Sequence, residues 1–287
     1  MGGLCGACLA AAQNNWRVLI WSEPGKNHWW EGKGILWKVL LPMVTSPVAG
    51  FIGGFLLMGL LYFLLRNWRP VTVNRVFGKL QWFSAAYMGF SHGTNDAQKT
   101  MGIITLALVV ATKAGLLAAA PHWLAWLQTP EGTPEGHLSP TAWVITHLPT
   151  WLQFGYQPPA IDSKSQFIPV WITCACALTM CAGTAAGGWR IIRTLGHKMV
   201  KLHPVHGFAA EATGATVLLT AAHFGMPVST THAITTSIMG VGCAKGFNAL
   251  KLSVVERILW AWVLTIPASG LVAYGLVRAA QMLGLMP

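Results

Sequence analysis

Residues 90–108 read FSHGTNDAQKTMGIITLAL and place a polar cluster, 91–100, between two apolar flanks. A polar group in an apolar environment costs on the order of several kcal/mol unless it finds a hydrogen-bond partner. The flanks, 80–90 and 101–111, are each shorter than the ~20 apolar residues that cross a bilayer. We therefore predict one crossing between 80 and 120, made by a helix that is broken at the polar cluster.

The composition of the whole chain indicates the same environment. Hydrophobic residues make up 54% of the 287 residues and charged residues only 9%, whereas soluble domains carry about 25% charged residues. The net charge of +11 does not indicate nucleic-acid binding, because Lys and Arg lie mainly in short segments between apolar runs. We predict an all-α integral membrane protein, a polytopic helical bundle in the lipid bilayer.

Three further apolar runs, 37–65, 167–189 and 258–283, are long enough to cross a bilayer as helices. Small residues are frequent in the second run and would let neighbouring helices approach closely. Together with the broken helix, these runs predict several crossings.

Basic residues follow three of the apolar segments, at 66–79, 190–204 and 245–257. Cytoplasmic loops of membrane proteins carry an excess of Lys and Arg, so we expect all three loops on the cytoplasmic side. The long segment 121–166, which has one basic residue, is then expected on the outer side.

A second polar interruption lies at 225–232, which reads GMPVSTTH. The apolar pieces around it, 213–224 and 233–244, have about 12 residues each and reach only ~18 Å as helices. Their length favours a re-entrant hairpin with its tip near the membrane midplane. Two full crossings would leave the ends on the same side as well, so charge does not separate the alternatives.

Both interruptions precede apolar helix, so each is expected to present a helix N-terminus to its polar residues. Such an N-terminus favours an anion because its backbone N–H groups and its dipole point toward the ligand. Ser229, Thr230 and Thr231 add hydroxyls that can donate to an oxyanion or accept at an N-cap. Broken helices in transporters place substrate in this way.

Asp96 and Glu211 are the acids that lie in or against apolar runs, where ionisable groups usually have a partner or a function. Asp96 is predicted to ligate a cation, carry a proton, pair with Lys99 or cap the helix that follows. Glu211 is predicted either to bind a coupling ion or proton, or to pair with Arg190 or Lys201.

Asn95 and Gln98 can both donate and accept hydrogen bonds, which suits ion ligation as well as helix–helix bonding. Lys99 could attract an anion or neutralise a carboxylate. His92 and His232 flank the two interruptions, and we expect packed or hydrogen-bonded side chains rather than titrating switches. A metalloenzyme built on His92, Asp96 and His232 has no supporting ligand motif, so no enzyme, resident metal or cofactor is predicted.

Three stretches together resemble the inorganic phosphate transporter (PiT) family, specifically its bacterial low-affinity branch. They are SHGTNDAQKTMG at 91–102, GFAAEA at 207–212 followed by GMPVSTTH at 225–232, and GGWRIIRTLG at 187–196. The resemblance implies symport of inorganic phosphate, or of a metal–phosphate complex, with H⁺ or Na⁺ across the bacterial inner membrane in a multi-pass protein.

The resemblance also implies a site. Substrate-binding positions are expected at Asn95, Gln98, Thr100, Ser229, Thr230 and Thr231, ion-coupling positions at Asp96 and Glu211, and secondary positions at Ser91, His92, Lys99 and His232.

One departure from the family pattern bears on function. The family has two inverted repeats, whereas this sequence has one Asn-Asp pair, so it resembles the second half of an inverted-repeat transporter. We expect 1–36 to be a partial helix and external loop left from the first repeat, and 37–287 to be the transmembrane transporter domain. A sulfate or other oxyanion permease and a non-transporting fragment remain alternatives, and a homo-oligomer could restore a complete site.

Overall fold

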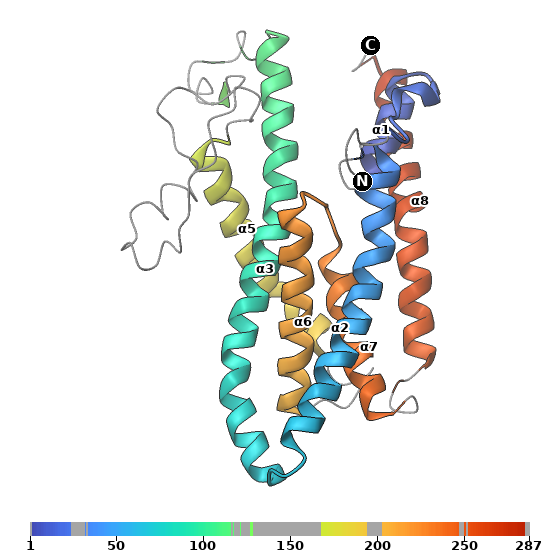
Figure 1. The fold of residues 1–287 in the computed structure, drawn as a ribbon. Coiled ribbons are helices and arrows are strands. Elements are labelled where there is room, and N and C mark those ends of the chain that lie inside the picture. The colour runs from blue at the N-terminus through green and yellow to red at the C-terminus, as the bar shows by residue number, and fades with distance from the viewer. Residues whose placement is uncertain are drawn as a thin grey trace. The chain divides into compact units, whose positions relative to one another are not determined.

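The computed structural model describes residues 2–23, 32, 34–115, 117, 121, 127–128, 168–193, 203–246, 250 and 252–284. The secondary-structure elements within these ranges are helices (Figure 1). The predicted outer loop, 121–166, and the end of the 187–196 stretch lie almost entirely outside the described residues. The expected sides of the loops and the division at residue 36 stay predictions.

Three described helices are long and apolar enough to cross a membrane: Leu36–Leu65, Val170–Gly188 and Ser253–Met282. The first comprises a π-helical turn, η3 (Leu36–Leu40), and α2 (Leu41–Leu65). The other two lie in α5 (Val170–Arg193) and α8 (Leu252–Met282). These helices confirm the three apolar runs that the sequence predicts as spans.

The helix α3 (Pro70–Lys113) corrects the prediction of a broken helix. It runs for 44 residues without interruption through the polar cluster at 91–100. It also begins within the predicted basic loop 66–79, of which only the first four residues lie outside the helix. The polar cluster therefore presents no helix N-terminus to an anion, and Asp96 does not cap a new helix.

Local hydrogen bonds explain why the polar cluster does not break α3. The Ser91 hydroxyl donates to the Tyr87 carbonyl at 2.8 Å, one turn earlier in the helix. Thr94 does the same to the Phe90 carbonyl at 2.9 Å. Such bonds satisfy a hydroxyl without interrupting the backbone ladder, and no proline lies within the cluster.

The second interruption is a turn between two helices, as predicted. α6 (Pro204–His223) and α7 (Thr230–Lys245) pack against each other in a helical hairpin. Both helices are longer than the predicted 12-residue pieces. With 20 residues, α6 reaches ~30 Å, about the thickness of the hydrocarbon core. The argument from length for a re-entrant hairpin is thus weaker, and re-entrance stays a prediction.

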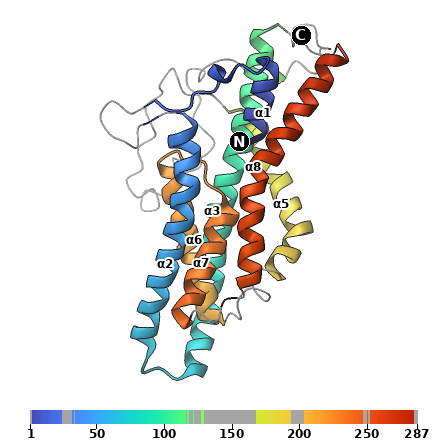
Figure 2. The same cartoon turned by 90° about the vertical axis from the view of Figure 1, so that its right-hand side faces the viewer.

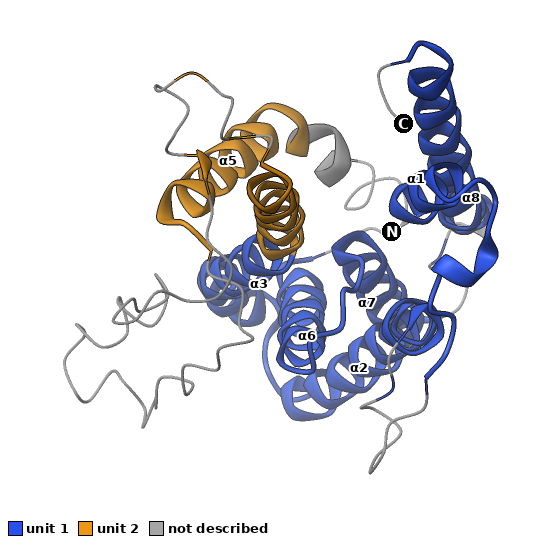
Figure 3. Cartoon of the chain, turned by 90° about the horizontal axis from the view of Figure 1, so that it is seen from above, with its two compact units in different colours: residues 1–95, 189–287 blue, residues 96–188 orange. Residues whose placement is uncertain are grey.

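The described chain forms two compact units (Figure 3). Unit 1 comprises Met1–Asn95 and Trp189–Pro287, and unit 2 comprises Asp96–Gly188. Unit 1 contains the hairpin, α2 and the first part of α3. Unit 2 contains the second part of α3 and most of α5.

A short N-terminal helix, α1 (Gly2–Ala11), packs against α8 in unit 1 (Figure 2). It buries Gly2, Gly6 and Ala10, which lie on one helical face. A Cβ atom on Gly6 would collide with the backbone of Gly270. Small residues therefore set the close approach of these two helices, as they do in many membrane proteins.

The contact between α2 and α7 uses the same principle. The buried residues of α2 recur every fourth position: Pro42, Ser46, Gly50, Gly54 and Met58. A Cβ on Gly54 would lie 2.5 Å from the carbonyl oxygen of Ser237 in α7, and Gly240 meets the backbone of Phe51. The backbones of the two helices thus approach closely at these glycines.

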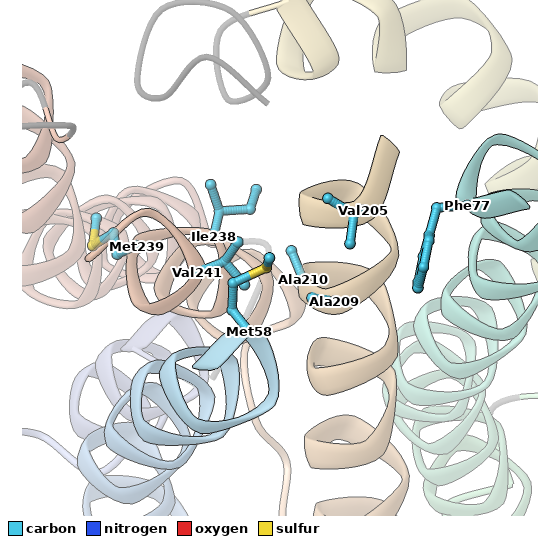
Figure 4. Packing of buried hydrophobic residues seen from close by; sticks show 8 residues of the cluster. All are labelled: Met58, Phe77, Val205, Ala209, Ala210, Ile238, Met239 and Val241. Atoms are coloured by element: carbon cyan, nitrogen blue, oxygen red, sulfur yellow. The ribbon is translucent and has the colours of Figure 1, made fainter. Parts of the chain in front are cut away.

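The apolar core of unit 1 lies where α2, α3, α6 and α7 meet (Figure 4). Its buried members are Met58, Phe77, Val205, Ala209, Ala210, Ile238, Met239 and Val241. Phe77 of α3 meets Phe208 of α6 edge to face, with ring centroids 5.3 Å apart. This core fixes α3 beside the hairpin and so determines which side chains can meet across them.

Candidate functional site

A row of buried polar side chains runs along one face of α3. Ser84, Ser91 and Asn95 are 4%, 0% and 4% exposed. Their spacing of seven and four residues places them on the same face of a continuous helix. Phe77, seven residues before Ser84, lies in the core on this face as well. The row therefore continues the face that packs against the hairpin.

Asn95 connects this row to the turn of the hairpin. Its side-chain amide donates to the main-chain carbonyl of Val228 at 3.3 Å, and Val228 is buried. Val228 immediately precedes the serine at which α7 begins. The structure thus brings one predicted substrate residue of the first motif next to the second motif.

The first turn of α7 holds the three hydroxyl residues predicted to bind substrate. Ser229 is the N-cap, and its Oγ accepts the main-chain N–H of His232 at 3.4 Å. Thr230 is buried and Thr231 is exposed. An N-capped helix start of this kind carries N–H groups and partial positive charge, so the predicted N-terminus at this motif is confirmed.

His232 is packed, as expected, rather than isolated. Its ring stacks on the indole of Trp262 in α8, with centroids 4.0 Å apart and an interplanar angle of 29°. This contact ties the start of α7 to a predicted span.

Glu211 of α6 contacts the polar row at Ser84, away from the contact between Asn95 and Val228. Its Oε2 accepts a hydrogen bond from the hydroxyl of Ser84 at 2.5 Å. Eleven residues separate Ser84 from Asn95, which is ~16 Å along a helix. Glu211 therefore does not share a ligand with Asn95, and its two predicted basic partners, Arg190 and Lys201, have side chains outside the described residues.

The remaining predicted residues of the first motif lie at or beyond the boundary between the units. Lys99 and Asp96 form an ion pair in unit 2, with Nζ and Oδ1 3.1 Å apart. Thr100 is exposed and donates its hydroxyl to the Asp96 carbonyl at 3.3 Å. Gln98 is exposed and His92 is partly buried. The pairing with Lys99, one of several alternatives for Asp96, is therefore present.

Sequence reasoning missed Ser84, whose hydroxyl donates to Glu211, and Gln81, whose side chain also hydrogen-bonds to Glu211. The available signal for Ser84 was its spacing from Ser91 and Asn95, which is the spacing of one helical face. That signal becomes visible only when 80–100 is treated as an unbroken helix.

Sequence reasoning also missed His206 at the start of α6. His206 is 5% exposed, its Nδ1 accepts the main-chain N–H of His203 at 3.0 Å, and its Nε2 lies 3.0 Å from the Tyr62 hydroxyl. A nitrogen that accepts carries no proton, so Nε2 carries the ring hydrogen and donates to Tyr62. This bond links α6 to the last turn of α2.

Among the described residues, no group of three or more His, Cys, Asp or Glu side chains is arranged to hold a metal. The polar groups described above are instead hydroxyl, amide and carboxyl groups on helices. Such groups suit the binding of small ions.

Comparison with known proteins identifies the family of the chain. Residues 1–273 match the phosphate transporter family. A probable low-affinity inorganic phosphate transporter of Bacillus subtilis (strain 168) is 32% identical over 277 residues, which cover 96% of this chain and 65% of the relative. A protein of the same description from Mycobacterium tuberculosis (strain ATCC 25618 / H37Rv) is 33% identical over 281 residues, covering 97% and 53%.

A solved structure titled "The sodium-dependent phosphate transporter" has a similar fold. The TM-score is 0.61 at 18% sequence identity, and the match covers 98% of this chain and 72% of that one. The chain spans between about half and two thirds of the length of the two relatives described above. The match over residues 1–273 shows that the chain is a multi-pass membrane protein that belongs to the phosphate transporter family.

Proposed function

We propose that this chain takes part in secondary transport of inorganic phosphate, as the free ion or a metal–phosphate complex, with H⁺ or Na⁺ as coupling cation. We place it in the inner membrane of a bacterium. Family membership supports the class of activity. Because the chain spans only part of its relatives, a homo-oligomer is part of the proposal.

The observation that carries the proposal is the hydrogen bond from Asn95 to the Val228 carbonyl. It holds an amide of the first motif beside the N-capped start of α7, where hydroxyls and N–H groups are gathered. This combination offers the donors that a tetrahedral oxyanion requires. The substrate residues proposed here are Asn95 and the hydroxyls at 229–231.

Gln98 and Thr100 complete the proposed substrate set, with Ser91, His92, Lys99 and His232 in supporting positions. Asp96 and Glu211 are the proposed coupling groups, because an ionisable side chain within a membrane helix is costly without such a role. The pairing of Asp96 with Lys99 would have to open for Asp96 to ligate a cation directly.

The test is uptake of radiolabelled phosphate by the purified full chain in proteoliposomes. We expect accumulation driven by an inward H⁺ or Na⁺ gradient, and imposing each gradient separately identifies the cation. Excess unlabelled phosphate should reduce the uptake of labelled phosphate, whereas the same concentration of sulfate should not. Competition by sulfate would favour an oxyanion permease, and absence of uptake under both gradients would favour a non-transporting fragment.

Two substitutions at one position test the anion site without removing the helix cap. Asn and Asp cap helices about as well as Ser, so Ser229→Asn and Ser229→Asp should both keep the start of α7. Ser229→Asp adds a negative charge where the anion is proposed to bind. We expect Ser229→Asp to lose uptake by at least about tenfold relative to Ser229→Asn, since like-charge contacts cost several kcal/mol. Equal uptake by the two variants would contradict the site.

A further inference from the structure

The hydroxyl of Ser84 lies close to two hydrogen-bond acceptors. Its Oγ lies 2.5 Å from Oε2 of Glu211 and 3.1 Å from the main-chain carbonyl oxygen of Gln81. Ser84 is 4% exposed, so water has little access to this hydroxyl. One hydroxyl hydrogen therefore faces two acceptors and can serve only one of them at a time.

The two acceptors correspond to two states of Glu211. When Glu211 is ionised, Ser84 donates its hydrogen to the carboxylate. When Glu211 takes up a proton, its Oε2–H donates to Ser84 Oγ, and the Ser84 hydrogen turns to the Gln81 carbonyl. In both states the hydroxyl hydrogen of Ser84, and the acid hydrogen of Glu211 when it is present, form hydrogen bonds. The protonated state differs from the ionised state by one proton gained from the aqueous phase.

Glu211 has one further side-chain hydrogen bond, to Gln81, and an amide side chain does not titrate. No described basic side chain forms an ion pair with Glu211. Tyr62 of α2 and His206 of α6 are hydrogen-bonded to each other. The ring of His232 in α7 stacks on Trp262. The other titratable or charged groups on α6, on α7 and on the part of α3 in unit 1 are Arg75, Lys79, Tyr87, His92, His223, Cys243 and Lys245.

We propose that Ser84 is a positioning residue that lets Glu211 hold or release one proton while the contact between α3 and α6 stays intact. The proton exchange itself stands on the geometry of the two side chains. Its meaning for coupled transport rests on the proposed function.

The experiment is an infrared pH titration of the purified full chain in lipid nanodiscs, which requires no transport. The carboxylic-acid C=O band of Glu211 is identified by its loss in Glu211→Gln. In Ser84→Ala we expect the band to shift in frequency, because the acid loses its acceptor. We also expect it to persist to a pH higher by roughly one unit, because the carboxylate loses its donor.

Two variants separate positioning from a general effect on packing. Ser237→Ala removes another buried serine hydroxyl, one that donates to the Ala233 carbonyl at 2.8 Å within its own helix. It should leave the Glu211 band unchanged. Ser84→Thr keeps a hydroxyl and should restore both the frequency and the midpoint of the band.

Two results would overturn the proposal. One is a Glu211 band in Ser84→Ala with the frequency and midpoint of the unsubstituted chain. The other is the absence of any Glu211-dependent acid band over the pH range in which the chain stays folded. A band that behaves as expected in a chain without phosphate uptake would keep this inference and reject the proposed function instead.

Discussion

Asn95 is buried within a membrane protein, and its amide reaches the backbone of a segment 133 positions away. A buried amide that loses its partner costs about 1–3 kcal/mol. Asn95 therefore stabilises the fold through this hydrogen bond, independently of any ligand. It fastens α3 to the turn before α7, so changes at this position act on the geometry of the candidate anion site as well as on its chemistry.

Replacing Asn95 by Ala should therefore destabilise the chain by about 1–3 kcal/mol, because the Val228 carbonyl loses its donor and a void forms. Thermal unfolding in detergent measures the change. Thr94→Ala is the matched control, since the Thr94 hydroxyl bonds only to carbonyls of its own helix, at Phe90 and Ser91. Equal unfolding temperatures for the two variants would contradict the role of the Asn95 bond.

At the scale of elements, glycine spacing decides how α2 and α7 approach. The buried face of α2 recurs every four residues, and at Gly54 even a methyl group would meet backbone atoms of α7. Backbone atoms cannot move aside as a flexible side chain can. The helix pair therefore depends on the absence of side chains at particular positions.

Two glycines of the same helix test this dependence. Gly54→Ala should destabilise the chain by about 1–3 kcal/mol through overpacking against Ser237. Gly59→Ala has nothing within 4 Å of the new methyl group and should stabilise α2 by about 0.5–1 kcal/mol. Unfolding temperatures that move in the same direction for both variants would contradict the packing described here.

The elements also show how far the sequence could predict this fold. The apolar runs of α2, α5 and α8 were predictable because their length and composition permit little else in a membrane. The break in α3 was predicted wrongly, because hydroxyls such as that of Ser91 are satisfied within the helix. Side-chain chemistry alone does not tell whether a polar residue interrupts a helix or bonds back to it.

The candidate site was predictable to a similar extent. The N-cap at Ser229 was one of the two roles that local chemistry predicted for its hydroxyl. The partner of Glu211 lies 127 positions away on another helix, and no local rule connects the two. Long-range pairs of this kind need either the fold or a correct register for α3.

At the scale of the whole molecule, the membrane position of the hairpin is open to a direct test. We expect Phe224→Cys, in the turn of the hairpin, to escape labelling by a membrane-impermeant maleimide added from the outer side. Each new cysteine is introduced into a variant of the chain in which the six native cysteines have been replaced. Trp68→Cys, between α2 and α3, should be labelled only from the cytoplasmic side.

Inside-out and right-side-out vesicles of the same preparation separate the two faces. Labelling of Phe224→Cys from the outer side would establish two full crossings in place of a re-entrant hairpin. Labelling of Trp68→Cys from the outer side would reverse the orientation proposed for the entire chain.

The length of α3 carries a last consequence. Its 44 residues extend ~66 Å, about twice the ~30 Å of hydrocarbon that a bilayer offers. Even a helix tilted by ~40° keeps only roughly 26 residues within that layer. A large part of α3 must therefore lie among headgroups or in water. One continuous helix thus meets environments of very different polarity, and a change in bilayer thickness would alter which of its polar residues are hydrated.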